Sequence, residues 1–362
     1  MPPDPPGDTI DVRADERLDE ARLADYLRGR LPGAEGPNVP GGSGGPLTVR
    51  QFGGGAANLT YLLQYGPSEY VLRRPPLGPV APSSHDMGRE YRVLSVLHRA
   101  FPPAPRAFHL CEDASVIGAP FFVMERRLGV VVRREVPAAF SAIPAAPRRM
   151  GLALVDALAD LHAVDYAGLG LETLGKPAGF LERQIEGWLG RWEKATLVDV
   201  PDMTWVHDWL RERCPPPASA SLVHNDYKLD NVMLAADDPG RLVAVLDWDM
   251  CTLGDPLADL GSLLCYWSEP GDPPPFRAMS MMPTAPGFPS RAELVARYAE
   301  RSGRDVRHIE FYHVLGLYRL AVIAAQIFVR FHRGQTKDQR FAAFGPLVGV
   351  VAAAARERAG RG

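Results

Sequence analysis

One stretch of the chain, residues 221–261, constrains the fold more than any other. It contains two short apolar runs, residues 222–223 and 242–246, and each leads directly into acidic and amide side chains. Short apolar runs bounded by polar residues are typical of buried strands, and polar groups delivered at strand ends often line functional sites. The stretch therefore predicts a site at the edge of a small sheet.

The polar side chains after these runs have the chemistry that phosphoryl transfer needs. That reaction requires an acceptor oxygen held in line and metal ions that neutralise the phosphates. Asp226 is placed to accept the proton of an attacking hydroxyl, and Lys228 to contact the transferring phosphate. Asn231 and Asp247 offer the oxygen ligands that Mg²⁺ prefers. Taken alone, Asp226 is better interpreted as an exposed turn aspartate.

These residues belong to a longer pattern, His224-x-Asp226-x4-Asn231, then Leu246-Asp247, then Gly254-Asp255-Pro256-x2-Asp259-Leu260. The pattern resembles the aminoglycoside phosphotransferase and choline kinase family of small-molecule kinases, and its first part has the spacing of the protein-kinase catalytic loop. Three further segments resemble the branch of that family fused to acyl-CoA dehydrogenases in animals: residues 70–76, 89–94 and 118–125.

The resemblance implies an α+β, bilobal, protein-kinase-like fold. Residues 1–46 are then an N-terminal tail, a helix and a Gly/Pro linker. Residues 47–127 form a small, mainly antiparallel nucleotide-binding lobe, and residues 128–362 a larger, mainly helical catalytic and substrate-binding lobe. ATP and Mg²⁺ are expected to bind between the lobes, and the phosphate is expected to go to a hydroxyl of a small molecule.

Within the larger lobe, Asp226 is expected to be the catalytic base, with Lys228 beside it, and Asn231 and Asp247 to be the metal ligands. His224 joins the catalytic group as the residue that orients the loop. Asp249 is a weaker metal candidate on the same strand face as Asp247. Two further acids are assigned to structure, as a turn residue and as a cap or loop brace: Asp255 and Asp259.

In the smaller lobe, a glycine turn is the first candidate for nucleotide contact. Gly54, Gly55 and the following Asn58 are placed to meet phosphates, partly through backbone N–H groups, although a plain hairpin turn is the simpler interpretation. Met124 and Glu125 end a predicted strand. By resemblance they form the hinge whose backbone meets the adenine, whereas the sequence alone favours a strand end with surface charges.

The smaller lobe lacks the lysine that kinase-like folds use to hold phosphates, because the first lysine of the chain is Lys176. Strand alternation places Val71 and Arg73 on one face, Val71 to cover the adenine and Arg73 to reach the phosphates. On the helix predicted over residues 86–99, Glu90 is the only charge in an apolar stripe, and a buried carboxylate needs a partner. We therefore predict an Arg73–Glu90 ion pair; the alternative is that Arg73 is a surface charge.

Hydrophobic periodicity, capping residues and helix-breaking residues predict the remaining elements. Residues 1–14 are expected to lack order. Ser290 and Glu293 form a capping box that opens a helix, which Gly303 ends. The segment 269–289 is expected to be a Pro- and Met-rich loop. Further helices are predicted over residues 15–31, 148–164, 180–195, 305–333 and 341–358.

Composition restricts the partners. The net charge of −3 lacks the basic footprint of nucleic-acid binding. No CxxC occurs among the four cysteines, which are expected to be reduced. The N-terminus has no signal-peptide pattern, and the apolar segments 314–331 and 341–355 do not reach a clean membrane span. We expect a cytoplasmic protein that binds neither nucleic acid nor membrane.

Three functions stay open. The first is an ATP- and Mg-dependent phosphotransferase acting on a small-molecule hydroxyl. Hydroxyacyl-CoA is the acceptor that the dehydrogenase-fused relatives suggest, and the Met-rich segment 276–288 contains no acid. The second is an aminoglycoside or other antibiotic O-phosphotransferase, and the third a catalytically inactive nucleotide-binding regulatory module. A protein kinase is disfavoured, because Gly254 follows Asp247 too closely to leave room for an activation segment.

Overall fold

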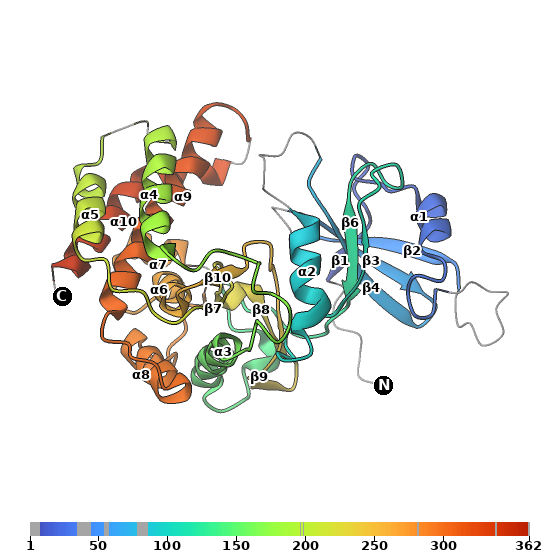
Figure 1. Cartoon of the computed structure of the whole chain (residues 1–362), viewed down its shortest axis with the longest axis horizontal. Helices are drawn as coiled ribbons and strands as arrows, with labels where there is room; N and C mark the ends of the chain where they lie inside the picture. Colours follow the sequence, from blue (N-terminus) through green and yellow to red (C-terminus); the bar gives the residue numbers. More distant parts are fainter. Residues whose placement is uncertain are drawn as a thin grey trace. The chain divides into compact units, whose positions relative to one another are not determined.

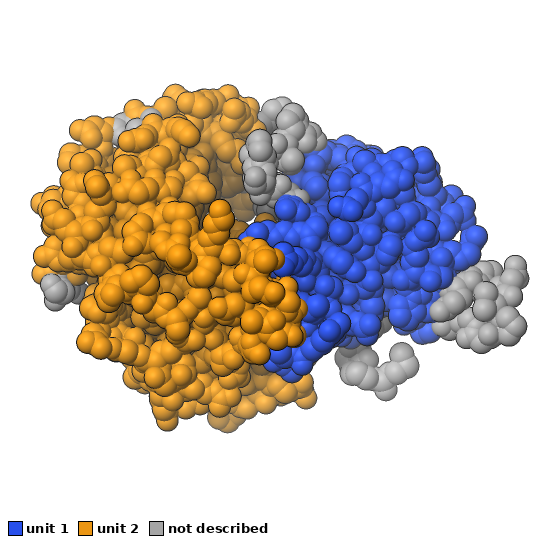
Figure 2. Space-filling model, in the orientation of Figure 1, with its two compact units in different colours: residues 1–128 blue, residues 129–362 orange. Residues whose placement is uncertain are grey.

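The computed structural model describes residues 8–34, 45–53, 58–77, 86–195, 197, 199–280, 282–336 and 339–360, without the side chains of residues 278 and 279. The chain divides into two compact units, Met1–Leu128 and Gly129–Gly362 (Figures 1 and 2). The first is built on an antiparallel sheet and the second is mainly helical, which confirms the predicted α+β class. Gly54 and Gly55 lie outside the described residues.

The smaller unit is built on a six-stranded antiparallel sheet. Its strands are β1 (Thr9–Ile10), β2 (Leu47–Phe52), β3 (Leu59–Tyr65), β4 (Ser68–Arg74), β5 (Ala107–Cys111) and β6 (Phe121–Glu125). Their order is β1-β2-β3-β4-β6-β5, so β6 inserts between β4 and β5 and pairs with both. This insertion places Val71 directly opposite Met124.

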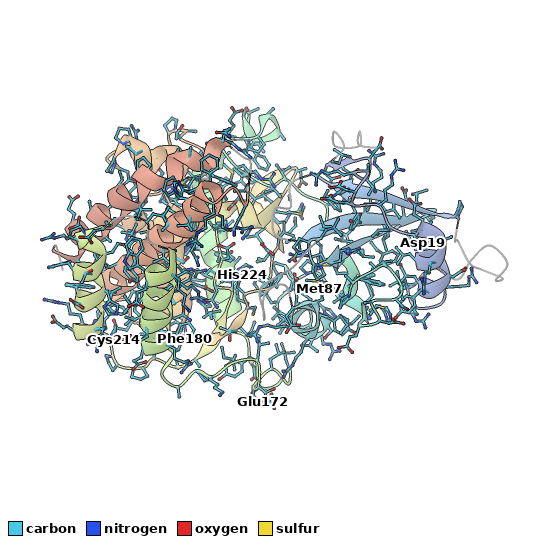
Figure 3. The ribbon with its side chains drawn as sticks, turned by 90° about the horizontal axis from the view of Figure 1, so that it is seen from above. Asp19, Met87, Glu172, Phe180, Cys214 and His224 are labelled. Carbon is cyan, nitrogen blue, oxygen red and sulfur yellow. The ribbon has the colours of Figure 1, made fainter. Side chains whose placement is uncertain are left out.

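Strand alternation separates two buried faces of this sheet. Tyr61, Leu63 and Leu72 on one face join a hydrophobic cluster with the helix α1 (Glu20–Leu27). Arg73 belongs to the opposite face, where the helix α2 (Met87–Leu97) buries its apolar stripe. Figure 1 shows the two helices on different sides of the sheet, and Figure 3 labels Asp19 and Met87 at their starts. The smaller unit therefore has one mainly apolar layer and one layer that contains a charged pair.

The N-terminal segment is more ordered than the sequence indicated. The prediction that residues 1–14 lack order is wrong for Thr9 and Ile10, which pair with β2. Helix α1 begins at Glu20 rather than residue 15, because the Asp19 side chain caps it by accepting from the Arg22 N–H. Strand β5 was not predicted, since its five residues depend on pairing with β6 rather than on a pattern of their own.

The larger unit has a helical core with two short strand pairs. Strand β7 (Ser221–Val223) pairs with β10 (Thr252–Gly254), and β8 (Val232–Ala235) pairs with β9 (Asp238–Val245), both antiparallel. The α-helices are α3 (Ala146–His162), α4 (Phe180–Ala195), α5 (Pro201–Glu212), α6 (Pro256–Tyr266), α7 (Pro274–Met279), α8 (Arg291–Ser302), α9 (Ile309–His332) and α10 (Phe344–Ala359). Short 3-10 helices lie at Ala138–Phe140, Leu229–Asn231 and Gln339–Ala343.

Helices α7 and α9 differ from the predictions, and the signals at both ends of α8 are confirmed. Helix α7 lies inside the segment 269–289, which we predicted as loop; two prolines in its first turn supply the fixed φ that starts a helix. Helix α9 begins at Ile309 rather than 305, because the Asp305 side chain bonds the Arg307 N–H in a turn. The capping box of Ser290 and Glu293 and the closing Gly303, at φ 67°, are confirmed.

Helix α9 is the central helix of the larger unit. It contacts α4, α5, α6 and α10. By length and composition it is the one helix among the described residues apolar enough to cross a membrane, with a mean hydropathy of 1.7 over 18 residues. More than half of that window, 56%, is buried inside the protein. Packing on four neighbouring helices accounts for this apolar composition.

Helices α6 and α9 approach each other through glycine. A Cβ added at Gly261 would lie 2.3 Å from the carbonyl oxygen of Tyr312, and one added at Gly316 would lie 2.5 Å from Cys265 Sγ. No side chain fits in either place without moving the backbone. Because α6 directly follows β10, which pairs with β7, this contact also fixes the position of these two strands relative to α9.

We predict that Gly261→Ala destabilises the protein by at least about 2 kcal/mol, because the added methyl group must displace the α9 backbone. Urea unfolding of the full chain measures the change. Gly190→Ala is the matched control: it adds the same methyl group to α4, where nothing lies within 4 Å. The control is expected to stabilise by about 0.5–1 kcal/mol through helix propensity. Equal stability of the two variants would contradict the close-contact interpretation.

Candidate active site

The register of one hairpin brings two predicted metal ligands together. Val232, at the start of β8, pairs with Val245, at the end of β9. Asn231 precedes the first strand and Asp247 follows the second, so both lie at the same end of the hairpin. The backbone N–H of Leu246 donates to the Asn231 carbonyl at 2.8 Å, which extends the pairing by one residue. Residues 16 positions apart thereby become neighbours.

Asp226 is held by two side chains of its own loop. Lys228 Nζ lies 2.5 Å from Asp226 Oδ2. Asn231 Nδ2 donates to the same oxygen and to the Asp226 carbonyl, each at 2.8 Å. Among the described residues no donor contacts Oδ1, so this oxygen stays available to an acceptor hydroxyl. The Asp226 side chain is 20% exposed, which lets a small molecule reach it.

Lys228 is a charged group in a largely buried position. Burial alone would lower the pKa of Lys228, but the charge of Asp226, with Tyr266 and Asp230, outweighs burial and raises that pKa. The ammonium also lies 5.2 Å from the ring centroid of Tyr266, a cation–π contact. Lys228 therefore holds a fixed positive charge next to the predicted base.

His224 is buried and connects the loop of Asp226 to the end of β9. Its Nδ1 accepts from the Asp226 N–H at 3.3 Å, so the proton is on Nε2, which donates to the Leu246 carbonyl at 2.9 Å. The side chain is completely buried, and this burial lowers the pKa of His224, which keeps the imidazole neutral. A buried neutral ring with both nitrogens engaged can orient the loop, the role that the sequence indicated.

Asp259 braces the same loop from α6. Its carboxylate accepts from the backbone N–H groups of His224, at 2.6 Å, and Asn225, at 2.7 Å, and from His162 Nε2 at 3.3 Å. Burial alone would raise the pKa of Asp259, but His162 and the His224 N–H outweigh burial and lower that pKa. The predicted brace is confirmed, and His162 is a packed histidine with contacts at both ring nitrogens. Its Nδ1 lies 2.7 Å from the Tyr298 hydroxyl.

Two residues of the site have unusual backbone conformations. Asn225 and Asp247 have φ values of 64° and 65°, in a region that residues other than glycine seldom adopt. Such strain persists only where surrounding contacts enforce it, and it concentrates at functional sites. Asn225 was not among the predicted site residues, although asparagine tolerates this conformation and directly precedes Asp226. Asp255, predicted as a turn residue, is the N-cap of α6.

In the smaller unit the predicted ion pair is confirmed. Arg73 Nη1 donates to Glu90 Oε1, and the side chains of Arg73 and Glu90 are 9% and 0% exposed. Arg74 points to the other face, where it donates to the Ile117 carbonyl at 2.8 Å. The alternative of surface arginines is therefore wrong. Asn58 is buried just before β3, whose Thr60 pairs with Arg73, so Asn58 and Arg73 lie at the same end of the sheet.

The candidate adenine contacts share one part of that sheet. Val71 and Met124 are cross-strand partners, and both are buried. Glu125 ends β6, where its carboxylate lies 3.1 Å from Arg127 and its N–H donates to the Arg106 carbonyl at 2.8 Å. The apolar partners and the strand end that the sequence singled out are thus adjacent to each other.

The donors of Asn231 and Asp247 fit a magnesium ion. Asn231 commits its Nδ2 to Asp226, so its Oδ1 is the atom left to meet a cation. In the described part of the chain no three His, Cys, Asp or Glu side chains gather as a metal cage. Mg²⁺ is commonly held by one or two protein oxygens, with phosphates and water completing the octahedron. The two oxygen donors of Asn231 and Asp247 are therefore compatible with a Mg²⁺ site.

Comparison with known proteins identifies relatives over most of the chain. The model of the phosphotransferase enzyme family matches residues 48–294. Acyl-CoA dehydrogenase family member 11 of Rattus norvegicus is 32% identical over 92% of this chain and 42% of its own length. Acyl-CoA dehydrogenase family member 10 of Mus musculus is 31% identical over 91% of this chain and 30% of its own length. The chain thus spans less than half the length of these curated relatives.

Solved structures confirm the protein-kinase-like fold. A candidate aminoglycoside phosphotransferase from Ralstonia eutropha superposes with a TM-score of 0.79 at 30% identity, over 95% of this chain and 99% of that one. Choline kinase from Cryptosporidium parvum superposes with a TM-score of 0.61 at 12% identity, over 94% and 96%. A thermostable mutant of the aminoglycoside phosphotransferase APH(4)-Ia, in complex with AMP-PNP and hygromycin B, superposes with a TM-score of 0.56 at 18% identity. The superposition covers 94% of this chain and 99% of that one.

The family match and the site agree with each other. Residues 48–294 are well over half of the chain, and they contain both the Arg73–Glu90 pair and the catalytic stretch. The relatives that match at 30% identity or more cover nearly all of it. This chain therefore belongs to the phosphotransferase enzyme family, as a small-molecule kinase.

Proposed function

We propose that this chain transfers the γ-phosphate of ATP, in the presence of Mg²⁺, to a hydroxyl group of a small molecule. The observation that supports this most strongly is the geometry around Asp226. One carboxylate oxygen is fixed by Lys228 and Asn231, and the other is left for a hydroxyl. A regulatory module without turnover would have no need for a carboxylate positioned in this way.

In this proposal Asp226 is the general base. Its Oδ1 accepts the proton as the hydroxyl oxygen forms a bond to the γ-phosphorus, and the bond to the β,γ-bridging oxygen breaks to release ADP. Lys228 supplies positive charge beside the transferring phosphoryl group. His224 and Asp259 act as positioning residues that hold the loop. Asn231 and Asp247 would hold Mg²⁺, which when bound would supply positive charge for the phosphates.

The smaller unit supplies the nucleotide contacts. Arg73 takes the place of the usual lysine, with Glu90 fixing the direction of its guanidinium. An arginine can contact two phosphate oxygens at once, whereas a lysine acts as a point charge. Val71 and Met124 are proposed to cover the adenine beside the backbone of Glu125. Asn58, with Gly54 and Gly55 of the preceding turn, is proposed to contact phosphates.

The acceptor is proposed to have an acyl portion, with hydroxyacyl-CoA as the leading candidate. Pockets for aminoglycosides, which are polycations, need clustered carboxylates of their own. The segment 268–293 encloses a cavity of about 560 Å³ lined by Met282 and Phe288. Its two acids are already engaged, Glu269 by Arg291 at 2.9 Å and Glu293 by Arg148 at 2.6 Å. Its lining favours an apolar group over a polycation.

We predict that Asp226→Asn keeps ATP affinity nearly unchanged and lowers kcat by about 10²- to 10⁴-fold, the usual contribution of a general base. Asp247→Ala is expected to weaken Mg-dependent nucleotide binding as well. Steady-state kinetics and calorimetric titration with AMP-PNP separate the two effects. Full activity of Asp226→Asn on a true substrate would rule out the base assignment.

The Arg73–Glu90 pair gives a second prediction. Arg73→Ala and Glu90→Gln are both expected to raise the KM for ATP by about 10-fold or more. The first variant removes the guanidinium proposed to contact the phosphates, and the second removes the carboxylate that orients it. Arg50→Ala is the matched control: it removes an exposed arginine of the same sheet, paired with Asp11 at 3.0 Å. Circular dichroism checks that the variants fold, since breaking a buried pair also costs stability. A KM unchanged in folded Arg73→Ala would contradict the proposal.

A substrate panel tests the acceptor. ATP consumption is measured with hydroxyacyl-CoA thioesters, free hydroxy acids, choline and kanamycin-type drugs. We expect turnover with the thioesters and little with the polycations. Efficient phosphorylation of kanamycin with none of the thioesters would overturn the acceptor class while leaving the kinase chemistry intact. No ATP consumption with any compound, despite AMP-PNP binding, would support the regulatory alternative.

A further inference from the structure

Two arginines from different helices gather on one tryptophan of the larger unit. The guanidinium carbon of Arg191, on α4, lies 4.4 Å from the ring centroid of Trp188, and that of Arg319, on α9, lies 5.3 Å from the same ring. Trp188 is buried and its Nε1 donates to Gln184. Helix α4 runs from Phe180, which is labelled in Figure 3. The indole therefore serves as a rigid platform for two like charges.

Neither guanidinium is neutralised within the part of the chain that the structure describes. No described carboxylate lies within 4.0 Å of Arg191 or Arg319. Other arginines of the larger unit behave differently: Arg211 pairs with Glu186 of α4 at 3.3 Å, and Arg297 pairs with Asp156 at 2.7 Å. Arg191 and Arg319 share one aromatic ring, and neither has an acidic partner among the described residues, so an anion from outside the chain can pair with them.

Arg319 places a charge on an otherwise apolar stretch of helix. It is the only charged residue between positions 311 and 329 of α9, the central helix of the larger unit. Arg319 is half-buried and Arg191 is exposed, so a ligand from solvent can reach both side chains. Partial desolvation, and then the charge of Arg319, lower the pKa of Arg191. A bound anion would relieve the repulsion between these two like charges.

The pair lies next to the catalytic loop. Arg319 Nη2 lies 3.8 Å from Met250 Sδ, and the Met250 carbonyl accepts from Asn225 Nδ2 at 2.9 Å. Asn225 directly precedes Asp226. Met250 is 44% exposed, so a molecule can reach the place where these residues meet. One residue, Met250, thus links the arginine pair to the loop that carries the base.

We propose that Arg191 and Arg319 form a binding site for a phosphate group carried by the acceptor substrate. The proposal rests on the proposed function, because it takes the site of Asp226 as the place where the acceptor reacts. A phosphate offers enough terminal oxygens for two guanidinium groups, whereas a lone carboxylate is satisfied by one. The acceptor is then a phosphate-bearing, anionic molecule with its reactive hydroxyl at some distance from that phosphate. Trp188 and Met250 provide an apolar border to the same site.

Binding of phenyl phosphate, a simple phosphate monoester, tests the site. Ligand-observed NMR titrations use the full chain, with and without saturating AMP-PNP and Mg²⁺, so that the nucleotide's own phosphate site is filled in one arm. We expect phenyl phosphate to bind in both arms. Arg191→Glu gives Arg319 a carboxylate within the protein. It is expected to weaken phenyl phosphate binding by at least about 10-fold, since charge-assisted hydrogen bonds are lost and an acid is added.

The same variant gives a readout that distinguishes binding from structure. Because Arg191→Glu pairs Arg319, its Tm is expected to equal or exceed that of the wild type while binding is lost. Arg211→Glu is the matched control, an equal charge change at an exposed arginine of α5. It is expected to leave phenyl phosphate affinity within about two-fold, because only charges near the phosphate act strongly at ordinary salt. Arg319→Lys keeps the positive charge but loses the planar set of guanidinium donors, so it should weaken binding partially.

Three results would overturn the proposal. Binding unchanged in Arg191→Glu would remove the arginine pair from the site. Equal losses in Arg191→Glu and Arg211→Glu would indicate general electrostatics. Benzoate binding as tightly as phenyl phosphate would replace the phosphate by a carboxylate. If the wild type fails to bind AMP-PNP but still binds phenyl phosphate through Arg191, the kinase function fails and the anion site stands.

Discussion

The buried carboxylate of Asp259 is the interaction on which the active site depends. It accepts from two consecutive backbone N–H groups of the catalytic loop and from His162, at the point where Asn225 takes a positive φ. A carboxylate buried without donors would be strongly destabilising, so these contacts are obligatory for the fold as well as for the loop. The loop is therefore positioned by the core of the larger unit as well as by its own residues.

In the proposed phosphotransferase, an arginine in place of the usual lysine changes how the smaller unit can hold phosphates. A guanidinium keeps its charge when buried and presents several donors in one plane, whereas an ammonium is a compact charge that is easily neutralised by burial. Glu90 is fully buried and fixes Arg73 from α2. The rest of the α2 stripe is apolar, so the orientation of this one pair is set by helix packing and not by surface charges.

Two features of the larger unit are uncommon in a helical core. One is the close glycine contact between α6 and α9, and the other is the charge of Arg319 on α9. Gly261 and Gly316 bring α6 and α9 into backbone contact, which holds Asp259 at a fixed depth. On the same central helix, Arg319 is half-buried and lies over the ring of Trp188. The first feature serves the fold, and the second is the one that we propose to serve an anionic acceptor.

The sequence by itself determined the elements whose information is local. The apolar stripe of α2 with Glu90 in it, the alternation that puts Arg73 beside Val71, and the capping box at Ser290 all follow from periods of 3.6 and 2 and from backbone donors at helix ends. Only the tertiary structure decided what depends on long-range partners: β5 exists because β6 pairs with it, and Asn231 meets Asp247 because a hairpin sets their register. The pair of Arg191 and Arg319 belongs to this second class, because two residues 128 positions apart reveal a shared site only when their helices pack.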